Sequence, residues 1–520
     1  MALFYAYSST INDIVSYFQA KESSPFPENC IKKLEEIDNV PFDNLATFLN
    51  KYSYNDLSFN VSCIRPYAFV GNKLSGNNIF SGCSIVKTSA FRGCSTVRVT
   101  LPDCEIIKTS AFGFCSGLYI SAEKCKIIES YAFHNCYMPT SFYFPDCEFI
   151  GDRAFYSCSY VPSQWNLPKC KYIGSSVFEG CYGIRSFVAS SCSYIGDYAF
   201  YSFYSNFFTT AIFPACEHVG RFAFASNHYL SSVNFESCKI IDEYAFASCT
   251  MLSSISLPFC ENIGSSAFSS CTNLTFIDLP SCQYIGSYAF GRCSRISYAN
   301  LPECTELGSF AFNACYSLSN ISIPACISFG NGALAFCSTL SSVSIHVSFM
   351  QSFLFEGCLS LKYVYASECT RICSYAFSGC SQLSTLITST ITRIEAGAFK
   401  NARCPSVSIL SYCQYIGNSA FDSCSNLWHA SITLYSCSFI GSYAFNATSM
   451  GSLYLLGSSF VTLQNSNAFN GTKIQQGDTY GPDVNHLSTT WSSICVPSSM
   501  IASYKKMAQW SYWSNRFSAI

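Results

Sequence analysis

The feature that most constrains this chain is a phenylalanine that returns about every 22 residues, usually after an alanine. Nineteen copies of this position occur at spacings of 21 to 24 residues, and a leucine replaces the phenylalanine once. The position is occupied by Phe69, Phe91, Phe112, Phe133, Phe155, Phe178, Phe200, Phe224, Phe246, Phe268, Phe290, Phe312, Leu334, Phe355, Phe377, Phe399, Phe421, Phe445 and Phe469. A repeat of this length cannot bury its apolar side alone, so successive repeats stack into a solenoid.

The repeated unit has the form L-x-x-I-x-L-P-x-C-x-x-I-G-x-x-A-F-x-x-C, as in LTFIDLPSCQYIGSYAFGRC at residues 274–293. Its first nine positions match the leucine-rich-repeat pattern L-x-x-L-x-L-x-x-N/C. The L-x-x-I-x-L segment alternates as a half-buried strand does, so its leucine and isoleucine positions face inward. Phe276 and Asp278 lie between them and are expected to face outward.

The second half of the unit predicts how each coil turns. Pro280 ends the strand because proline cannot donate to a ladder. Gly286 follows where a turn or a close neighbouring backbone favours a residue without Cβ. Ala289 and Phe290 then return inward on the opposite wall. The sequence therefore predicts a leucine-rich-repeat solenoid of about nineteen coils over residues 61–470, mainly β with short turns and little helix.

The unit IGxxAFxxCxxLxxIxLP resembles the BspA-like leucine-rich repeats of bacterial and protozoan surface proteins. The resemblance covers roughly residues 61–470, and residues 494–520 are similar to the segment that often closes such arrays. The chain departs from many relatives by having LPxC where they have IPxxV. The resemblance implies a non-catalytic surface or adhesion protein with a protein or glycan ligand.

Cysteines form two sets in the repeat. Fifteen lie eight residues before the phenylalanine and thirteen lie three residues after it. Because eleven is half of 22, we expect the sets on opposite sides of each coil, as two ladders with rungs about 4.8 Å apart. The central rungs are Cys260, Cys282 and Cys304 in the first ladder, and Cys271, Cys293 and Cys315 in the second.

Three roles are open for these thiols: buried space-filling residues, disulfides or metal ligands. Disulfides require Cβ atoms roughly 3.5–4.5 Å apart, which is less than the rung spacing. Cys369 and Cys424 are expected to have no cysteine beside them, since Ala402 and Thr448 flank Cys424 in its ladder. No C-x₂-C occurs and the six histidines are scattered. The favoured interpretation is a small, buried core residue with a weak S–H donor.

Composition excludes several functional classes. Charged residues make up 12% of the chain against a usual ~25%, and the 29 basic residues form no run, which argues against nucleic-acid binding. The chain contains no stretch of ~18 apolar residues, so the sequence predicts no membrane insertion. We expect no secretory signal in the first twenty residues, which have no basic segment. The resemblance points to the cell surface or secretion, whereas the missing signal favours the cytoplasm or non-standard export.

Sequence patterns that look like catalytic or cofactor-binding motifs are parts of the repeat unit. GNGALA at 330–335 has the spacing of a nucleotide-binding turn, but it is the I-G-x-x-A-F phase of one copy. No G-x-S-x-G occurs, and no Ser/His/Asp group or carboxylate pair stands outside its repeat slot. We expect no enzyme activity, cofactor or metal.

The two ends do not repeat. Residues 1–60 show helical periodicity and are expected to form a small helical N-terminal cap or a docking region. Residues 471–490 indicate a polar loop, and a short helix at 498–509 is expected to complete a C-terminal cap over residues 471–520. Trp510, Trp513 and Phe517 are predicted to pack on the last coil.

Outward strand positions are the candidate binding residues, because packing does not dictate them. They include Tyr143, Phe276, Tyr298, Tyr363 and Tyr365, set among serine and asparagine as in paratopes. Ordinary cross-strand stacking of aromatic residues is the alternative. The leading hypothesis is a non-catalytic recognition or adhesion protein that binds a protein or glycan through this strand face. The second is a structural spacer, such as an envelope or phage-tail component, docked through the N-terminal region.

Overall fold

The computed structural model of the chain describes residues 58–71, 77–201, 207–427, 430–448, 450–476 and 493–520. Its contacts divide it into two compact units, Met1–Cys216 and Glu217–Ile520. Within each unit the chain forms a parallel β-solenoid of the predicted kind, with about nineteen coils in total and little helix. The expected helical region at 1–60 lies almost entirely outside the described residues, as does most of the expected polar loop at 471–490.

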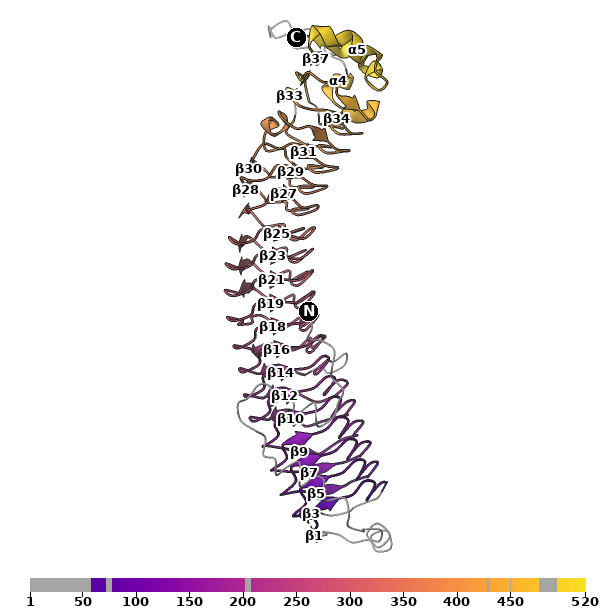
Figure 1. The fold of residues 1–520 in the computed structure, drawn as a ribbon, viewed down its shortest axis with the longest axis vertical. Helices are drawn as coiled ribbons and strands as arrows, with labels where there is room; N and C mark the ends of the chain where they lie inside the picture. The colour runs from indigo at the N-terminus through magenta and orange to yellow at the C-terminus, as the bar shows by residue number, and fades with distance from the viewer. Residues whose placement is uncertain (1–57, 72–76, 202–206, 428–429, 449, 477–492) are drawn as a thin grey trace. The chain divides into compact units, whose positions relative to one another are not determined.

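Unit 1 contains two series of parallel strands (Figure 1). The first series comes from the L-x-x-I-x-L segment and consists of β1 (Ser58–Asn60), β3 (Asn77–Ser81), β5 (Arg98–Thr100), β7 (Tyr119–Ser121), β9 (Ser141–Tyr143), β11 (Gln164–Asn166), β13 (Ser186–Val188) and β15 (Thr210–Ile212). The second series comes from the residues before I-G and consists of β2 (Cys63–Ile64), β4 (Ile85–Val86), β6 (Ile106–Ile107), β8 (Ile127–Ile128), β10 (Phe149–Ile150), β12 (Tyr172–Ile173) and β14 (Tyr194–Ile195).

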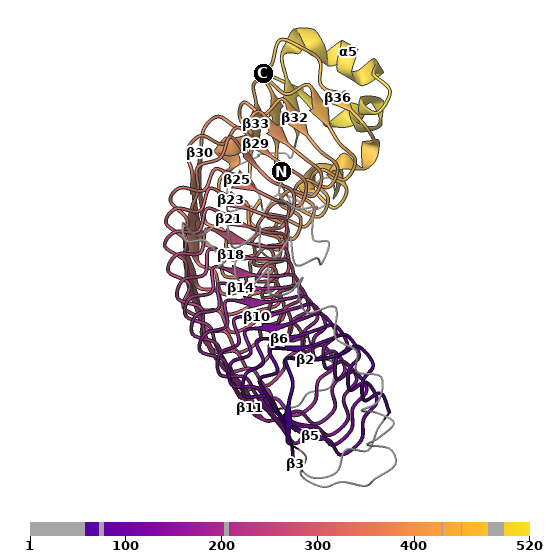
Figure 2. The same cartoon turned by 60° about the horizontal axis from the view of Figure 1, so that its bottom comes forward.

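Unit 2 repeats both series (Figure 2). Its first series is β17 (Ser232–Asn234), β20 (Phe276–Asp278), β22 (Tyr298–Asn300), β24 (Asn320–Ser322), β26 (Ser342–Ser344), β28 (Tyr363–Ala366), β30 (Thr385–Thr388), β33 (Ile432–Leu434), β35 (Leu453–Leu455), β37 (Ile494–Val496) and β38 (Phe517–Ala519). Its second series is β16 (His218–Val219), β18 (Ile240–Ile241), β19 (Asn262–Ile263), β21 (Tyr284–Ile285), β23 (Glu306–Leu307), β25 (Ser328–Phe329), β27 (Phe349–Met350), β29 (Arg371–Ile372), β31 (Arg393–Ile394), β32 (Tyr415–Ile416), β34 (Phe439–Ile440) and β36 (Thr462–Leu463).

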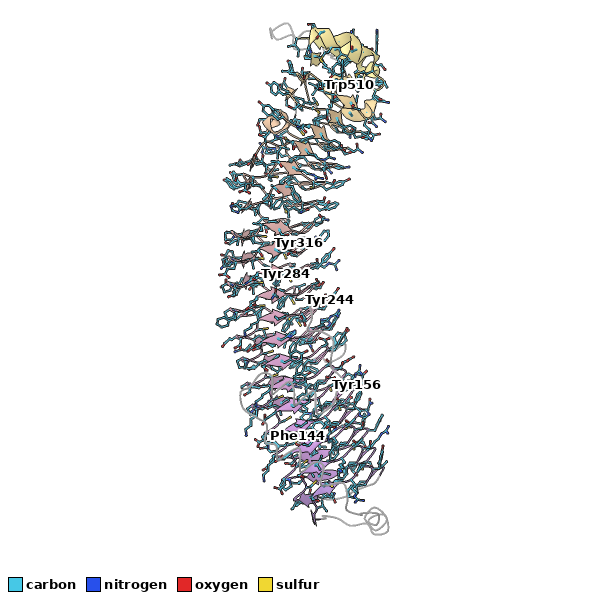
Figure 3. All side chains as sticks on the ribbon, viewed as in Figure 1. Phe144, Tyr156, Tyr244, Tyr284, Tyr316 and Trp510 are labelled. Atoms are coloured by element: carbon cyan, nitrogen blue, oxygen red, sulfur yellow. The ribbon has the colours of Figure 1, made fainter. Side chains whose placement is uncertain are left out.

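The repeated phenylalanine forms the centre of the core. In unit 2, the rings of Phe246, Phe268 and Phe290 stack nearly parallel, with centroids 5.2 and 5.3 Å apart. In unit 1, Phe91 and Phe112 stack in the same way at 4.9 Å. These rings are fully buried, and side chains of successive coils lie in layers (Figure 3). Each ring therefore packs mainly against its own equivalent one coil away.

Backbone hydrogen bonds fix the distance between coils. The Phe268 N–H donates to the Ala289 carbonyl in the next coil at 2.8 Å, as Phe246 does to Ala267 at 2.7 Å. Gly286 lies where the backbones approach closely: a Cβ there would fall 2.5 Å from the Ser265 nitrogen. The close approach of two coils, and not an unusual turn, is what favours glycine at this position.

The C-terminal segment closes unit 2. Its helices are short: η3 (Ser466–Phe469), α4 (Lys473–Gln476), η4 (Ser498–Met500), α5 (Ile501–Lys506) and η5 (Trp510–Arg516), with η2 (Val407–Leu410) earlier in the chain. α5 lies at the C-terminal end of the unit, where Figure 3 also labels Trp510. The Trp510 indole N–H donates to the Val461 carbonyl at 2.7 Å, and the Val461 N–H donates to the Tyr504 hydroxyl at 3.0 Å.

These contacts pair both backbone groups of Val461 with the C-terminal segment. The rings of Trp510 and Trp513 lie 6.0 and 5.7 Å from that of Phe469. The segment also contributes more than the sequence indicated, because β37 and β38 continue the first strand series after β35.

Candidate functional site

Three of the five candidate aromatic residues share one column of outward positions in unit 2. Phe276 of β20 is in register with Tyr298 of β22, which is in register with Asn320 of β24. Tyr363 of β28 is in register with Ser342 of β26. The 22-residue period places Asn320 and Ser342 in the same column, so the fold brings Phe276 and Tyr298 together and separates them from Tyr363 by two small polar residues.

A second column, two residues further along each strand, contains Tyr365. Tyr365 is in register with Ser344 and Ile387. In the same column the Asn300 amide donates to the Asp278 carboxylate at 2.9 Å. We call the two columns the strand face; it consists of Phe276, Asp278, Tyr298, Asn300, Asn320, Ser322, Ser342, Ser344, Tyr363, Tyr365, Thr385 and Ile387.

The candidates are exposed as the alternation of the strands predicts. Tyr143, Phe276, Tyr298, Tyr363 and Tyr365 keep between 41% and 50% of their surface exposed. On the unit 2 strands the inward neighbours Ile277, Ala299 and Val364 are buried. Tyr143 lies on β9 in unit 1, in register with Ser121, and is not part of the strand face. The strand face is thus an exposed, mostly uncharged surface of aromatic and small polar side chains.

The first thiol ladder is buried and locally hydrogen-bonded. Cys260, Cys282 and Cys304 are free thiols with no exposed surface. Each Sγ donates to the backbone carbonyl two residues later, at 3.4, 3.3 and 3.3 Å. Other coils have valine or isoleucine in this slot, as at Val347 and Ile391, and these are buried as well. This slot therefore accepts any compact apolar side chain.

The second ladder connects each coil to the one before it. Cys271, Cys293 and Cys315 are also buried, free thiols. The Cys293 Sγ donates to the carbonyl oxygen of Phe268, the core phenylalanine of the preceding coil, at 3.0 Å. Cys271 and Cys315 make the equivalent contact at 3.2 Å. Each of these thiols thus forms a hydrogen bond from one coil to the preceding coil.

Three residues that replace cysteine in the second ladder carry a donor. The Asn227 amide donates to the Phe224 carbonyl at 2.9 Å, and the Thr448 hydroxyl donates to the Phe445 carbonyl at 2.8 Å. Thr472 likewise donates to the phenylalanine carbonyl of its own coil. The thiols of the second ladder thus match the expected small, buried residue with a weak S–H donor, and the donor satisfies a buried carbonyl.

The expectation that Cys424 has no cysteine neighbour is wrong. The Cys404 thiol lies close enough to Cys424 to raise the pKa of the Cys424 thiol, and both thiols are free. The Cys404 N–H donates to the Asn426 side-chain oxygen at 2.7 Å. Ala402 keeps the backbone position of the repeat, with its N–H bonded to the Phe399 carbonyl at 3.1 Å, and Cys404 follows two residues later.

Burial makes these thiols poor acids. Desolvation raises the pKa of Cys293 from 9.0 to about 12 and that of Cys304 to about 11. The pKa values of Cys271 and Cys315 are raised well above 9.0, first by desolvation and then by neighbouring thiols. Within the described residues no group of three or more potential ligands is placed to hold a metal ion. The thiols with raised pKa values are therefore protonated and unreactive at neutral pH.

A third row of side chains was not anticipated from the sequence. It occupies the position two residues before the core phenylalanine, where the backbone is left-handed. In unit 2, the residues at this position between 222 and 397 have φ values from 54° to 63°. We call it the turn row: Phe222, Tyr244, Ser266, Tyr288, Phe310, Gly332, Phe353, Tyr375 and Gly397. Bulky residues at positive φ are unusual and cost of order 1–2 kcal/mol each.

Stacking offsets that cost along the turn row. The pairs Phe222–Tyr244, Tyr288–Phe310 and Phe353–Tyr375 stack at 4.6, 5.0 and 5.3 Å. A small residue follows each pair, so the row alternates two rings and one gap. The signal in the sequence is the second variable position of I-G-x-x-A-F, which is aromatic twice in every three coils here.

Comparison with known proteins identifies the repeat. The family described as BspA type leucine rich repeat region (6 copies) matches residues 62–185, 171–281, 261–384 and 350–475. The chain belongs to the BspA-type leucine-rich repeat family. In this family the solenoid is a recognition scaffold, since stacked coils create extended surfaces for binding. No helix in the described part of the BspA-type chain is long and apolar enough to cross a bilayer.

Several solved structures are similar to this chain. A leucine-rich repeat protein from Bacteroides ovatus is 20% identical over 89% of this chain and 92% of its own, with a TM-score of 0.42. A leucine rich cell surface protein from Faecalibacterium prausnitzii is 18% identical over 70% and 83%, with a TM-score of 0.30. The leucine rich repeat protein of T. pallidum is 26% identical over 30% and 78%, with a TM-score of 0.28. Among curated proteins there is no significant match.

The two ladders should respond differently to the same substitution. Cys293→Val removes the donor to the Phe268 carbonyl and should lower the free energy of unfolding by about 1 kcal/mol. Cys282→Val should change it by less than about 0.5 kcal/mol, because valine already occupies this slot at Val347. Cys293→Thr should recover part of the loss by supplying a hydroxyl. Chemical denaturation measures all three, and equal losses for the two valine variants would contradict distinct roles.

Alkaline pH should unfold the protein through its thiols. Burial raises the pKa of Cys293 from 9.0 to about 12 and that of Cys304 to about 11, so the contribution of each thiol to stability is complete below pH 9 and is lost as pH rises toward its folded-state pKa. Each loses about 1.4 kcal/mol per pH unit in that window, and many act together. Thiolate absorbance should therefore appear in one step with loss of circular dichroism. Gradual thiolate formation near pH 9 with the fold intact would show that the thiols are accessible.

Proposed function

We propose that this chain is a recognition and adhesion protein that binds a protein or glycan ligand through the strand face. The observation that carries the proposal is the arrangement of Phe276, Tyr298, Tyr363 and Tyr365 in two in-register columns on rigid strands. Strand pairing fixes their backbones, so little conformational entropy is lost when these side chains meet a ligand.

The composition of the strand face supports this role. Tyrosine offers a large amphipathic contact, and serine and asparagine between the rings offer adaptable hydrogen bonds. Asp278 is the one charged residue among the twelve, and it is hydrogen-bonded to Asn300. Such a surface fits a neutral or mixed ligand better than a strongly charged one.

The proposal extends to the other parts of the chain. A non-enzymatic role fits a scaffold whose outward residues follow the repeat. The C-terminal segment acts as a cap, as the pairing of Val461 with Tyr504 and Trp510 supports. A docking role for the N-terminal region concerns residues outside those that the structure describes.

The strand face can be tested by removing three of its rings together. The full-length variant Tyr298→Ala, Tyr363→Ala and Tyr365→Ala should lose at least about tenfold in affinity for ligands that the unmodified chain binds on arrays of purified extracellular proteins and glycans. The matched control is Tyr316→Ala, Tyr412→Ala and Tyr435→Ala, which removes three exposed tyrosines outside the strand face. Unchanged binding by the first variant, or an equal loss by the control, would contradict the proposal.

A further inference from the structure

A pocket of about 400 Å³ opens on the turn row of unit 2, at the gap left by Ser266. Tyr244 and Tyr288 form two of its walls, one coil before and one coil after the gap. The pocket continues past Tyr288 into the next coil, and none of its residues belongs to the strand face; the rest of its lining is Ser269, Gly291, Arg292, Phe310 and Asn313. Figure 3 labels Tyr244 at the margin of the stacked side chains.

The walls present two aromatic faces to the gap. Tyr244 stacks on Phe222 and Tyr288 stacks on Phe310, each on the side away from Ser266. Two rungs of the solenoid separate the tyrosines by about 10 Å, which leaves room for one flat or saddle-shaped ring in van der Waals contact with the walls.

The gap at Ser266 differs from the glycine gap that follows Phe310. There the Phe310 ring overlies Gly332, where a Cβ would collide with it. In the next gap Tyr375 covers Gly397 in the same way. At Ser266 the buried serine side chain forms part of the lining of the pocket, whereas the two glycine gaps lie directly under a ring.

The polar groups in the pocket are side chains. The N–H groups of Ser266, Tyr288 and Arg292 already donate to carbonyls of the following coil at 2.7–2.9 Å. A peptide strand would therefore find these main-chain donors occupied. The hydroxyls of Ser266 and Ser269, the amide of Asn313 and the guanidinium of Arg292 remain to meet a ligand.

These features match the chemistry of a sugar. One face of a pyranose ring is lined by C–H groups, which the negative face of an aromatic ring attracts, and its rim carries hydroxyls. Arg292 adds a positive charge, and no ion pair engages it within the described residues. A guanidinium recognises a carboxylate through two parallel hydrogen bonds.

We propose that this pocket binds a sugar ring that carries a carboxylate, as one unit of an acidic glycan. The proposal goes beyond the strand-face function, because it uses a different surface and needs no strand-face residue. A proline-rich peptide, which also favours aromatic grooves, is the competing occupant.

The test uses the full chain and isothermal titration calorimetry. The probes are an oligomer of a hexuronic acid, a sialylated oligosaccharide, a neutral hexose oligomer of equal length and a proline-rich peptide. At least one acidic sugar should bind at least tenfold more tightly than the neutral oligomer and the peptide. Arg292→Gln should reduce acidic-sugar binding to the level of the neutral oligomer.

Ser266→Tyr is the decisive variant. It fills the gap with a ring at a left-handed position that already accepts Tyr244 and Tyr288, so the chain should fold and melt at the same or a higher temperature. Binding of the acidic sugar should fall at least tenfold. The matched control, Ser419→Tyr, makes the same change at another left-handed turn-side position, outside the pocket, and should bind normally.

Three results would overturn the proposal: no binding of either acidic sugar, equal binding by Ser266→Tyr, or preferential binding of the peptide. Neutral-sugar binding equal to acidic-sugar binding would also reject the carboxylate. The strand-face variant should retain acidic-sugar binding, so failure of one proposal is distinguishable from failure of the other.

Discussion

The pairing of each coil with the next through backbone hydrogen bonds sets the scale of the structure. The Phe268 N–H bonded to the Ala289 carbonyl is one instance, and it holds successive phenylalanine rings about 5 Å apart. At that distance stacked rings are in contact, so each ring is covered on both faces by its neighbours. It is slightly too long for stacked cysteines to join, which is why long rows of thiols coexist in the core without forming bridges.

The same spacing decides which outward side chains can act together. On the strand face, rings one rung apart, such as those of Phe276 and Tyr298, form a continuous contact surface. On the turn row, Tyr244 and Tyr288 are two rungs apart and enclose a pocket. Unit 2 thus offers both an extended surface and a discrete cavity. On the turn row, whether a coil carries an aromatic or a small residue decides whether the stack of rings continues or is interrupted.

The fold was predictable from the sequence because the period is regular and the strand alternation is clear, as Phe276 and Ile277 illustrate. The chemistry of the second thiol ladder was less accessible, since it depends on the direction of the Phe268 carbonyl. The signal was present in Asn227, Thr448 and Thr472, whose shared property is a hydrogen-bond donor and not a size. The pocket could not be foreseen because neighbouring coils had to be aligned in space before the gap beside Ser266 became visible.

The most direct test of this account is the state of the 33 cysteines. Stacked coils with buried, unbridged thiols predict that a thiol reagent titrates 33 groups per chain in denaturant, with or without prior reduction. They also predict almost no reaction in the native protein. A shortfall in denaturant that reduction restores, or rapid reaction of most thiols in the folded chain, would contradict the central claim that the coils bury their thiols side by side without joining them.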